Sequence, residues 1–489
     1  MNEDDPGKSV LTEQAKTVFA SARTASRTWG SLAPAKRAAC IGALMRECVR
    51  SRDEIVGTVC AESGKMPAEA LQSDLLPTLE TLRYLAKHAA NLLRPRRAHT
   101  PLIFRASTSR VEYRPRGVVL VIAPWNNPFQ LSLIPVATAL AAGNAVVLKP
   151  SERAPETGRL LGELCRRAGL PSDVLQIVTG DPAVAKALVE ERPDLIFFTG
   201  GVRNGRSVLT AAARHLIPVI LELGGKDPMV VFADANLDRA ARAAVYGAFA
   251  HAGQHCVSVK RLYVERSVYD AFLGRVAAET AALAATPDWG RLVDEGARAV
   301  AAEQVAEALA EGARLLAPAD KERAGAEPSV VADATPGMRL MQEETFAPVL
   351  TAMSFNSEDD AVRLANDSPF GLNASVWSRD LDRASSVVDR LHTGNAYVNN
   401  VLINVGNPNL PFGGVKSSGI GRYHGPEGLR AFCAETSVMV SRSTAGTEPN
   451  WFPHGASKQA MLEDLIDLRY GGQGWLRLLW GWIRLLRRL

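Results

Sequence analysis

The sequence predicts an α/β protein in which a helical N-terminal segment precedes two consecutive α/β patterns. Residues 9–95 repeat apolar positions at three- and four-residue spacing, which is typical of helices. After residue 117, short and fully apolar runs alternate with amphipathic stretches. Because strands that are apolar on both faces must be covered on both faces, these runs predict a parallel sheet between two helix layers. Ligands of such sheets bind at the carboxyl ends of the strands.

The first α/β pattern follows a basic cluster at residues 94–97 that ends the helical segment. We expect its strands at residues 118–122, 145–148, 174–178, 195–198 and 219–223. The helices between them are expected at residues 131–142, 156–167, 182–191 and 206–214. Each predicted strand is therefore followed by a helix, as a parallel sheet requires.

The second α/β pattern follows the pair Gly224–Gly225, which we interpret as a domain boundary. Its strands are expected at residues 229–232, 261–264, 349–355, 374–377 and 396–398. Its helices are expected at residues 237–249, 268–283, 298–311, 358–366 and 381–391.

Composition limits the possible classes of protein. With 489 residues, 47% hydrophobic and 22% charged, the chain is predicted to be globular with more than one domain. A net charge of +4 is too small to suggest nucleic acid as a partner. The six cysteines form no CxxC pair and no cluster at metal-ligand spacing, so we expect no metal. The acidic N-terminus has no signal-peptide pattern, which favours a cytoplasmic protein.

Two short motifs carry the groups that acyl chemistry needs. Cys256 lies in Gly-Gln-His-Cys-Val-Ser, a turn of small and polar residues, and Glu222 ends an apolar run before Leu-Gly-Gly-Lys. A thiol that attacks a carbonyl carbon must later release an acyl group, and a nearby carboxylate can activate the water that releases it. A single cysteine and a single glutamate prove little by themselves.

Two successive strand-to-loop junctions could hold a dinucleotide. Lys149 and Glu152 follow the second predicted strand, and a carboxylate there can accept hydrogen bonds from ribose hydroxyls. Gly200 and Gly205 follow the fourth strand, where glycines let the backbone approach phosphate. Either junction alone is more often a solvated turn, whereas two in successive units favour a nucleotide site.

Two further motifs have a functional and a structural interpretation. Asn126, in Pro-Trp-Asn-Asn-Pro, could donate to a developing oxyanion, although Asn-Pro turns are common. Glu344 and Phe346, in Glu-Glu-Thr-Phe-Ala-Pro-Val, could lie beside a cofactor, although a helix end leading into a strand would give the same pattern.

In this order, the motifs resemble those of the aldehyde dehydrogenase superfamily over roughly residues 10–440. The matching pieces are Pro-Trp-Asn at 124, Lys-Pro-Ser-Glu at 149, Phe-Thr-Gly at 198, Glu-Leu-Gly-Gly-Lys at 222, Gly-Gln-His-Cys at 253, Glu-Glu-Thr-Phe-Ala-Pro at 343 and Leu-Pro-Phe-Gly-Gly-Val-Lys-Ser-Ser-Gly at 410. The chain departs from the usual pattern with Gly201 in place of serine, His251 in place of asparagine, Ala347 in place of glycine, and a shortened segment at 286–293.

The resemblance implies a Rossmann-like NAD-binding domain, an α/β catalytic domain and a small β oligomerisation element. The expected NAD-binding domain comprises residues 1–97 and 117–223, and the catalytic domain residues 224–423. The oligomerisation element comprises residues 98–116 and 424–442, and would build a homodimer or homotetramer. These boundaries are expectations from the family pattern.

The resemblance also implies a mechanism. Cys256 would be the nucleophile that attacks an aldehyde, and the Asn126 amide with the Cys256 backbone N–H would hold the oxyanion. Glu222 would activate water to hydrolyse the thioester. The branch of the family that transfers its acyl group to coenzyme A typically lacks this glutamate, so hydrolysis is favoured. A binding protein that keeps the fold without turnover would need a broken site, which this sequence does not show.

The cofactor implied by the resemblance is NAD, with NADP as an alternative. Lys149 and Glu152 would bind the adenosine ribose, and a carboxylate there repels the ribose phosphate of NADP. Glu344 would hold the nicotinamide ribose, with Phe346 beside the ring. The other residues expected to contact the cofactor are Trp125, Gly200, Gly205 and Gly224.

Residues 443–489 extend beyond the usual end of the family. The sequence predicts an amphipathic helix at 456–470, followed by a Trp- and Leu-rich segment at 474–489 with arginines on one helical stripe. This segment is shorter than the roughly 20 residues that cross a bilayer, so it favours peripheral membrane contact and long-chain or other hydrophobic aldehydes. Its position is similar to that of the tail of fatty aldehyde dehydrogenases. Alternatively, its apolar face packs on a partner subunit or a tunnel mouth.

Overall fold

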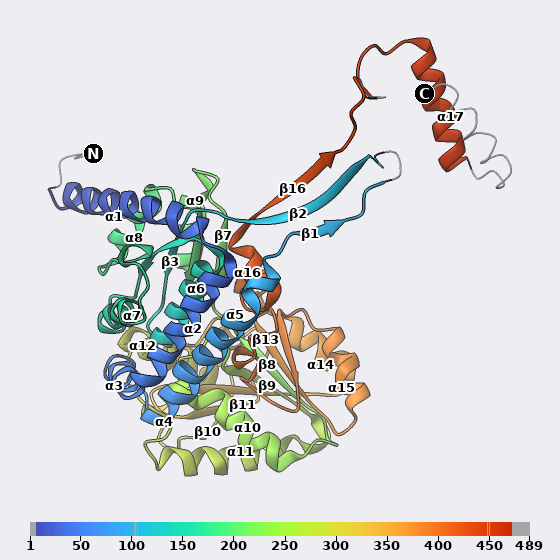
Figure 1. The fold of residues 1–489 in the computed structure, drawn as a ribbon. Coiled ribbons are helices and arrows are strands. Elements are labelled where there is room, and N and C mark those ends of the chain that lie inside the picture. Colours follow the sequence, from blue (N-terminus) through green and yellow to red (C-terminus); the bar gives the residue numbers. More distant parts are fainter. Residues whose placement is uncertain (1–5, 102–103, 105, 447, 449, 472–489) are drawn as a thin grey trace. The chain divides into compact units, whose positions relative to one another are not determined.

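The computed structural model describes residues 6–471, apart from 102–103, 105, 447 and 449 (Figure 1). The chain divides into two compact units. The larger unit comprises residues 1–95 and 112–436, and the smaller unit comprises residues 96–111 and 437–489. The Trp-rich segment predicted at 474–489 lies outside the described residues.

The larger unit begins with the predicted run of helices. Its bounds are α1 Pro6–Ser31, α2 Pro34–Arg50, α3 Arg52–Ser63, α4 Pro67–Ala70, a π-helical turn Leu71–Leu75 and α5 Leu76–Leu92. Apolar residues at helical spacing, including Leu44 and Leu82, are fully buried in one core with the first sheet. The apolar periodicity of residues 9–95 therefore identified these helices correctly.

The first sheet has six strands in the order β15-β7-β6-β3-β4-β5. Their bounds are β3 Val118–Ile122, β4 Ala145–Lys149, β5 Leu175–Ile177, β6 Leu195–Thr199, β7 Val219–Glu222 and β15 Gly419–Ile420. The five strands from the first pattern pair in parallel, as predicted, and β15 pairs antiparallel with β7. β3 and β4 are buried along their whole length, which explains why their sequences are apolar on both faces.

The helices of the first sheet are α6 Pro128–Ala142, α7 Pro155–Arg167, α8 Pro182–Glu190 and α9 Val202–Ala213. Two of them begin well before the predicted position, whereas α7 begins only one residue early. The helix expected from 131 begins at Pro128, since proline at the first helical position lacks only an N–H that would have no partner there. The helix expected from 206 begins at Val202, directly after the glycine turn.

The second sheet has seven strands in the order β10-β11-β12-β9-β8-β13-β14. Their bounds are β8 Asp227–Val231, β9 Val259–Glu265, β10 Arg314–Ala317, β11 Ser329–Ala332, β12 Val349–Phe355, β13 Asn373–Trp377 and β14 Asn395–Val398. The strands β10 and β11 were not predicted, because each has only four residues and they flank a charged, alanine-rich loop.

The helices of the second pattern are α10 Leu237–Phe249, α11 Tyr269–Ala284, α12 Glu295–Ala310, α13 Arg339–Gln342, α14 Glu358–Asn366, α15 Leu381–Asp389 and α16 Gly425–Ala431. Five of them match predicted helices, whereas α13 and α16 are short additions.

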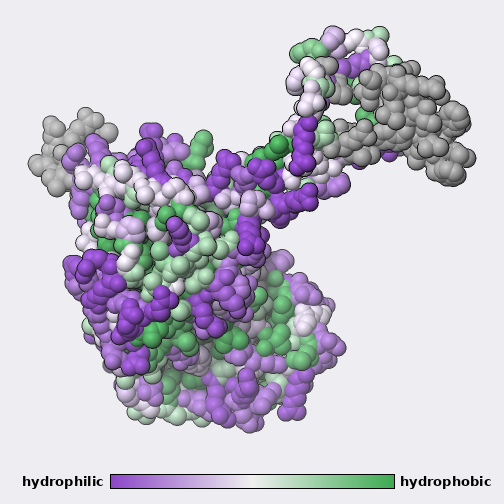
Figure 2. Space-filling view, viewed as in Figure 1, coloured by the Kyte–Doolittle hydropathy of each residue, from purple (hydrophilic) through white to green (hydrophobic). Residues whose placement is uncertain are grey.

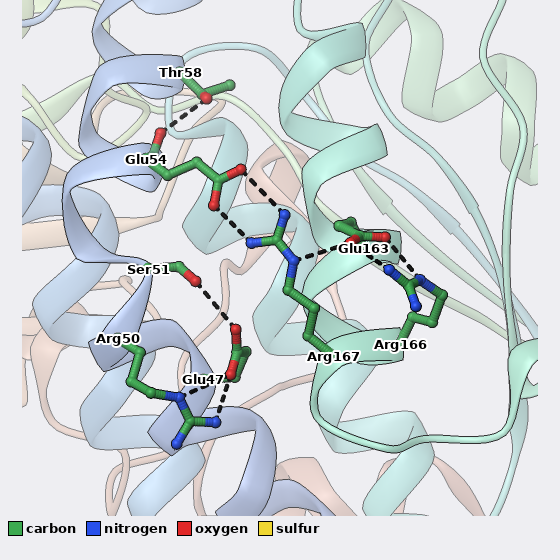
Figure 3. Close-up of polar contacts among 8 residues, drawn as sticks. All are labelled: Glu47, Arg50, Ser51, Glu54, Thr58, Glu163, Arg166 and Arg167. Carbon is green, nitrogen blue, oxygen red and sulfur yellow. Dashed lines mark hydrogen bonds and ion pairs between the residues drawn. The ribbon is translucent and has the colours of Figure 1, made fainter.

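Hydrophilic residues cover much of the visible surface of the larger unit (Figure 2). One cluster joins α3 to α7, where Arg167 contacts Glu54 at 2.8 Å and Glu163 at 2.9 Å (Figure 3). Because these groups are solvent-exposed, each pair contributes about 1 kcal/mol or less to stability.

The smaller unit contains most of a three-stranded sheet in the order β1-β2-β16, with β1 Arg96–Ala98, β2 Ser107–Pro115 and β16 Cys433–Ser441. β1 and β2 form an antiparallel hairpin in which Arg96 lies opposite Val111. The helix α17 spans Ala456–Tyr470, the bounds predicted from the sequence. Within the described part of the chain, no helix combines the length and the apolar character that a membrane span requires.

Candidate active site

The candidate site lies where the carboxyl ends of the first sheet meet the amino ends of the second. Glu222 ends β7 and stands between Thr199, which ends β6, and Gly419 of β15. The chain then passes directly through Gly224 and Gly225 into β8. The motif of Cys256 precedes β9 in the same way. Motifs from both α/β patterns therefore converge on one place.

The loop that carries Cys256 is held by its own residues. His251 and Ala252 adopt left-handed backbone angles, with φ of 51° and 52°. The Gln254 side chain donates to the carbonyls of His251 at 3.0 Å and Arg291 at 2.9 Å, and accepts from the Val293 N–H at 2.8 Å. Histidine is one of the few non-glycine residues enriched in left-handed conformations, so His251 fits this turn as asparagine would.

Two glycines allow three segments to approach one another. A Cβ at Gly225 would lie 2.4 Å from the Cys256 carbonyl oxygen, and a Cβ at Gly224 would lie 2.2 Å from Glu344 Oε2. The Gly225 N–H also donates to Glu344 Oε1 at 3.3 Å. Any side chain at these two positions would therefore push apart the loops of Cys256 and Glu344.

Glu222 is buried and lacks a strong partner. Its exposed fraction is 5%, and its Oε1 has no hydrogen-bond partner among the described residues. Burial raises the pKa of Glu222 well above its ordinary value, and Arg422 only partly opposes this shift. A carboxylate with a raised pKa is a stronger base, which is the property that activation of water requires.

Cys256 shares this electrostatic environment. The pKa of its thiol is raised by burial and then by the carboxylates of Asp227, Glu344 and Glu222. Glu222 is one of the carboxylates that raise the pKa of the Cys256 thiol, which agrees with a common chamber for the two groups. In this state the residue is a thiol, and the nucleophilic thiolate is favoured by rising pH.

Asn126 contacts the same loop. Its Nδ2 donates to the Gln254 carbonyl oxygen at 2.9 Å, two residues before Cys256. The amide predicted to hold an oxyanion is thus beside the nucleophile but already has an acceptor. Its role in binding the oxyanion stays a prediction, since that role requires the amide to exchange this acceptor for the substrate oxygen.

The residues predicted to hold a cofactor lie along the carboxyl edge of the first sheet and beside Glu344. Lys149 Nζ contacts Glu152 Oε2 at 3.0 Å, and the Glu152 side chain is 50% exposed. Burial alone would raise the pKa of Glu152, but its backbone hydrogen bond and Lys149 lower it below the ordinary value. The rings of Trp125 and Phe346 lie edge to face, with centroids 5.8 Å apart.

The predicted glycines help to bring these ends together. The Gly200 N–H donates to the Glu222 carbonyl oxygen at 3.0 Å, which closes β6 against β7. A Cβ at Gly205 would lie 2.4 Å from Leu223 Cδ2, so α9 packs closely on the end of β7. Whether these glycines also contact phosphate stays a prediction.

Comparison with known proteins agrees with this arrangement. The model of the aldehyde dehydrogenase family matches residues 8–438. The chain belongs to the aldehyde dehydrogenase family. It is 44% identical to a 4,4'-diapolycopene aldehyde oxidase of Methylomonas sp over 460 residues, which are 93% of this chain and 87% of the relative. A relative from Mycolicibacterium smegmatis whose name specifies NADP is 36% identical, over 88% of this chain and 85% of its own length.

Solved structures show the same fold. An NAD-dependent aldehyde dehydrogenase from Sinorhizobium meliloti superposes with a TM-score of 0.84 and 34% identity, over 90% of this chain and 89% of that one. A Mycobacterium tuberculosis aldehyde dehydrogenase complexed with NAD+ gives a TM-score of 0.83 and 33% identity, over 89% of this chain and 92% of that one.

This aldehyde dehydrogenase has a cavity of about 590 Å³ beside the nucleophile loop. Its wall includes His255, which directly precedes Cys256, and the apolar side chains of Met66, Phe249 and Trp289. Glu69 also faces it. The sequence did not predict this cavity, because α4, α10 and the loop before α12 supply its wall from distant positions.

Two buried lysines near the site were also not predicted from the sequence. Lys226 Nζ donates to Thr345 Oγ1 at 2.8 Å, and Lys260 Nζ donates to the carbonyls of Gly253 at 2.7 Å and Ala347 at 3.0 Å. Burial lowers the pKa of Lys260 to about 7, although Glu344 and Asp227 oppose the shift. A lysine inside the apolar run of β9 was the available sequence signal.

Proposed function

We propose that this aldehyde dehydrogenase oxidises a hydrophobic aldehyde to a carboxylic acid through Cys256, with NAD as the preferred hydride acceptor. The observation that carries the proposal is the convergence of the Glu222 end of β7 and the Cys256 loop, where Gly225 packs against the Cys256 carbonyl oxygen. A nucleophile and a strong base in one buried chamber are what acyl-enzyme formation and hydrolysis need.

In the proposed reaction, the Cys256 thiolate adds to the aldehyde carbon. The Asn126 amide and the Cys256 backbone N–H hold the resulting oxyanion. NAD, when bound, accepts the hydride that leaves this carbon. Glu222 then takes a proton from a water molecule, and the water oxygen attacks the carbonyl carbon of the resulting thioester. The C–S bond breaks, so Cys256 leaves as a thiolate and the carboxylic acid is released. Burial and the carboxylates of Asp227 and Glu344 raise the pKa of the Cys256 thiol, so formation of the thiolate is favoured at higher pH.

The residues at the sheet edge fit a dinucleotide. The lowered pKa of Glu152 keeps it a carboxylate at neutral pH, which suits ribose hydroxyls and repels a ribose phosphate. Lys149 would bind the same ribose, Glu344 the nicotinamide ribose, and Phe346 would lie beside the ring. Trp125, Gly200, Gly205 and Gly224 would line the site. One relative's name specifies NADP, so NADP is the second candidate.

The apolar wall of the 590 Å³ cavity supports a hydrophobic substrate. The 44% identical relative is named as an oxidase of diapolycopene aldehyde, which agrees with this substrate class. Purified protein with NAD and a panel of short, long and aromatic aldehydes tests the proposal. We expect NADH formation to be fastest with long or aromatic aldehydes, and no NADH from any aldehyde would refute the enzymatic function.

The same assay separates two rival functions. An enzyme that transfers its acyl group to coenzyme A would form NADH steadily only when coenzyme A is present, whereas we expect no dependence on it. A binding protein without turnover would form no NADH at all. The intact set of Cys256, Glu222 and Asn126 favours turnover.

The sequence of residues 474–489 supports peripheral membrane contact by a cytoplasmic protein. Three tryptophans and a stripe of arginines suit the headgroup region of an anionic membrane. We expect the full-length protein to float with anionic liposomes, while a variant ending at Gly472 stays in solution. If both stay in solution, the segment packs on a partner subunit or the cavity mouth instead.

We further propose a homodimer or homotetramer built through residues 98–116 and 424–442. The β1–β2 hairpin and the strand β16 supply unpaired strand edges for such an interface. Light scattering gives the oligomeric state, and deletion of the hairpin should yield a monomer.

A further inference from the structure

A buried lysine lies behind the candidate site. The Lys65 side chain is fully buried, as is that of Asp74, and Lys65 Nζ donates to Asp74 Oδ2 and to Asn127 Oδ1. Asp74 Oδ1 in turn accepts the backbone N–H groups of Phe129 and Gln130, each at 3.1 Å. Asp74 thus caps α6, which leaves the Asn127 side chain free of the capping role that its position would favour.

The lysine fixes the orientation of the Asn127 amide. An ammonium group only donates, so the side-chain atom of Asn127 that faces Lys65 must be its oxygen. The Asn127 Nδ2 then lies 3.1 Å from His255 Nδ1. Because an amide nitrogen only donates, His255 Nδ1 must be the unprotonated acceptor.

The proton of the His255 ring is therefore on Nε2. Burial, together with Lys65 and Lys260, lowers the pKa of His255 to about 3, so the ring is neutral and carries one proton. His255 lines the 590 Å³ cavity, and its ring contacts Asn127 through Nδ1, which leaves Nε2 on the other side of the ring. His255 Nε2 is thus a hydrogen-bond donor at the cavity, and Lys65 determines its protonation through Asn127.

This donor is on the residue before Cys256, in a wall that combines apolar side chains with polar ones such as Glu69 and Gln72. The neighbouring lining side chains include Met66, Phe249 and Trp289. A fixed donor among apolar side chains favours a ligand that brings an acceptor to the same point, because the donor loses water when the cavity fills.

We infer that His255 is a specificity-determining residue for aldehydes that carry a ketone or similar carbonyl acceptor on an apolar chain, and that Lys65 and Asn127 are the positioning residues that make it a donor. The inference rests on the proposed oxidation of aldehydes at Cys256. It adds the position and chemistry of a second polar group on the substrate.

The test uses straight-chain aldehydes of equal length, each with one ketone carbonyl at a different carbon, and the unsubstituted aldehyde as reference. For the wild type, we expect one ketone position to give a kcat/KM about tenfold above the reference, because one net hydrogen bond to the donor is gained. The gain should lie in KM rather than in kcat, since the ketone is remote from the reacting carbon.

Two substitutions of His255 separate the donor from the volume of the ring. In His255→Gln, the amide oxygen can accept from Asn127 while the amide nitrogen donates to the cavity, so the ketone preference should persist. In His255→Phe, the ring volume remains but the donor is lost, so the preference should fall to about one. In each variant, the preference is the ratio of kcat/KM for the ketone to that for the unsubstituted aldehyde, so a general change in activity cancels.

The positioning role of Asn127 and Lys65 is tested by substituting these residues. Asn127→Leu breaks the relay but keeps the Lys65–Asp74 pair, whereas Lys65→Met also leaves Asp74 without its cation and risks misfolding. Asn127→Leu should reduce the ketone preference in the wild-type background and have no further effect on it in His255→Phe. A purely structural role would slow both substrates equally in both backgrounds.

The outcomes are distinguishable. A wild type that oxidises all the aldehydes equally, or a preference that survives in His255→Phe, overturns the inference and leaves the proposed function standing. A wild type that oxidises none of them with NAD removes the proposed function and the inference together.

Discussion

The reactive chamber and the cofactor edge use glutamate in opposite ways. Glu222 is 5% exposed and its pKa is raised well above the ordinary value, because burial removes the water that would stabilise its charge. The side chain of Glu152 is 50% exposed, and hydrogen bonds including that of Lys149 lower its pKa. The same residue type thus has a raised pKa in one place, as the proposed base, and a lowered pKa in the other. Burial and partner, and not residue type, decide which.

The largest expected effect is the loss of the nucleophile from the reactive chamber. Cys256→Ser should lower the rate of NADH formation by about 10³-fold or more, because a hydroxyl is a far weaker nucleophile than a thiolate. Steady-state assays with a hydrophobic aldehyde measure this loss. Cys40→Ser, at a half-buried cysteine of α2, is the matched control and should keep full activity.

The next effect concerns the base in the same chamber. Glu222→Gln keeps the shape of the side chain but removes its basicity, so steady-state turnover should fall by about 10²–10⁴-fold. Because hydride transfer does not need this carboxylate, stopped-flow absorbance should show a burst of NADH before the slow phase. Full turnover in this variant would show that another group activates the water.

A smaller effect is expected at the cofactor edge. Glu152→Gln removes the charge that repels a ribose phosphate, so the ratio of kcat/KM for NADP to that for NAD should rise by about tenfold. Glu156→Gln, at an exposed glutamate in the first turn of α7, provides the control and should leave the ratio unchanged. An unchanged ratio in Glu152→Gln would place the ribose elsewhere.

The smallest effect concerns the pH dependence of stability at two buried groups, the basic His424 and the acidic Glu69. Burial lowers the pKa of His424 from 6.5 to about 3, so between these values the unfolded chain binds a proton that the folded chain does not. The contribution of neutral His424 to stability is therefore present above pH 6.5 and is lost as the pH falls toward 3, by about 1.4 kcal/mol per pH unit. As the pH falls over this range, the melting temperature of His424→Leu should fall less than that of the wild type.

Glu69 provides the opposite sign. Burial raises its pKa from 4.5 to about 7, so the folded chain holds a proton that the unfolded chain has already released. Its contribution is present below pH 4.5 and is lost as the pH rises through about 7. As the pH rises, the melting temperature of Glu69→Gln should therefore increase relative to that of the wild type. If the melting temperature of each variant follows the same pH dependence as that of the wild type, the shifted pKa values of His424 and Glu69 are contradicted.

The sequence by itself determined the α/β fold, the order of its strands along the chain and the groups that carry the chemistry. Apolar runs predicted β3, β4 and β6 because both faces of a parallel sheet are buried, a property visible in local composition. The motifs of Cys256 and Glu222 predicted a nucleophile and a base because their residue types limit the possible chemistry. The short strands β10 and β11 were missed, since they flank a charged, alanine-rich loop.

Only the tertiary structure decided how these groups behave. Lys65, Asn127 and His255 are far apart in the chain, yet their contacts fix which nitrogen of His255 carries a proton. Likewise, no local pattern shows that Glu222 is buried while Glu152 is half-exposed. The physical reason is that pKa and hydrogen-bond direction depend on desolvation and on neighbours brought together from distant positions, which local sequence does not record.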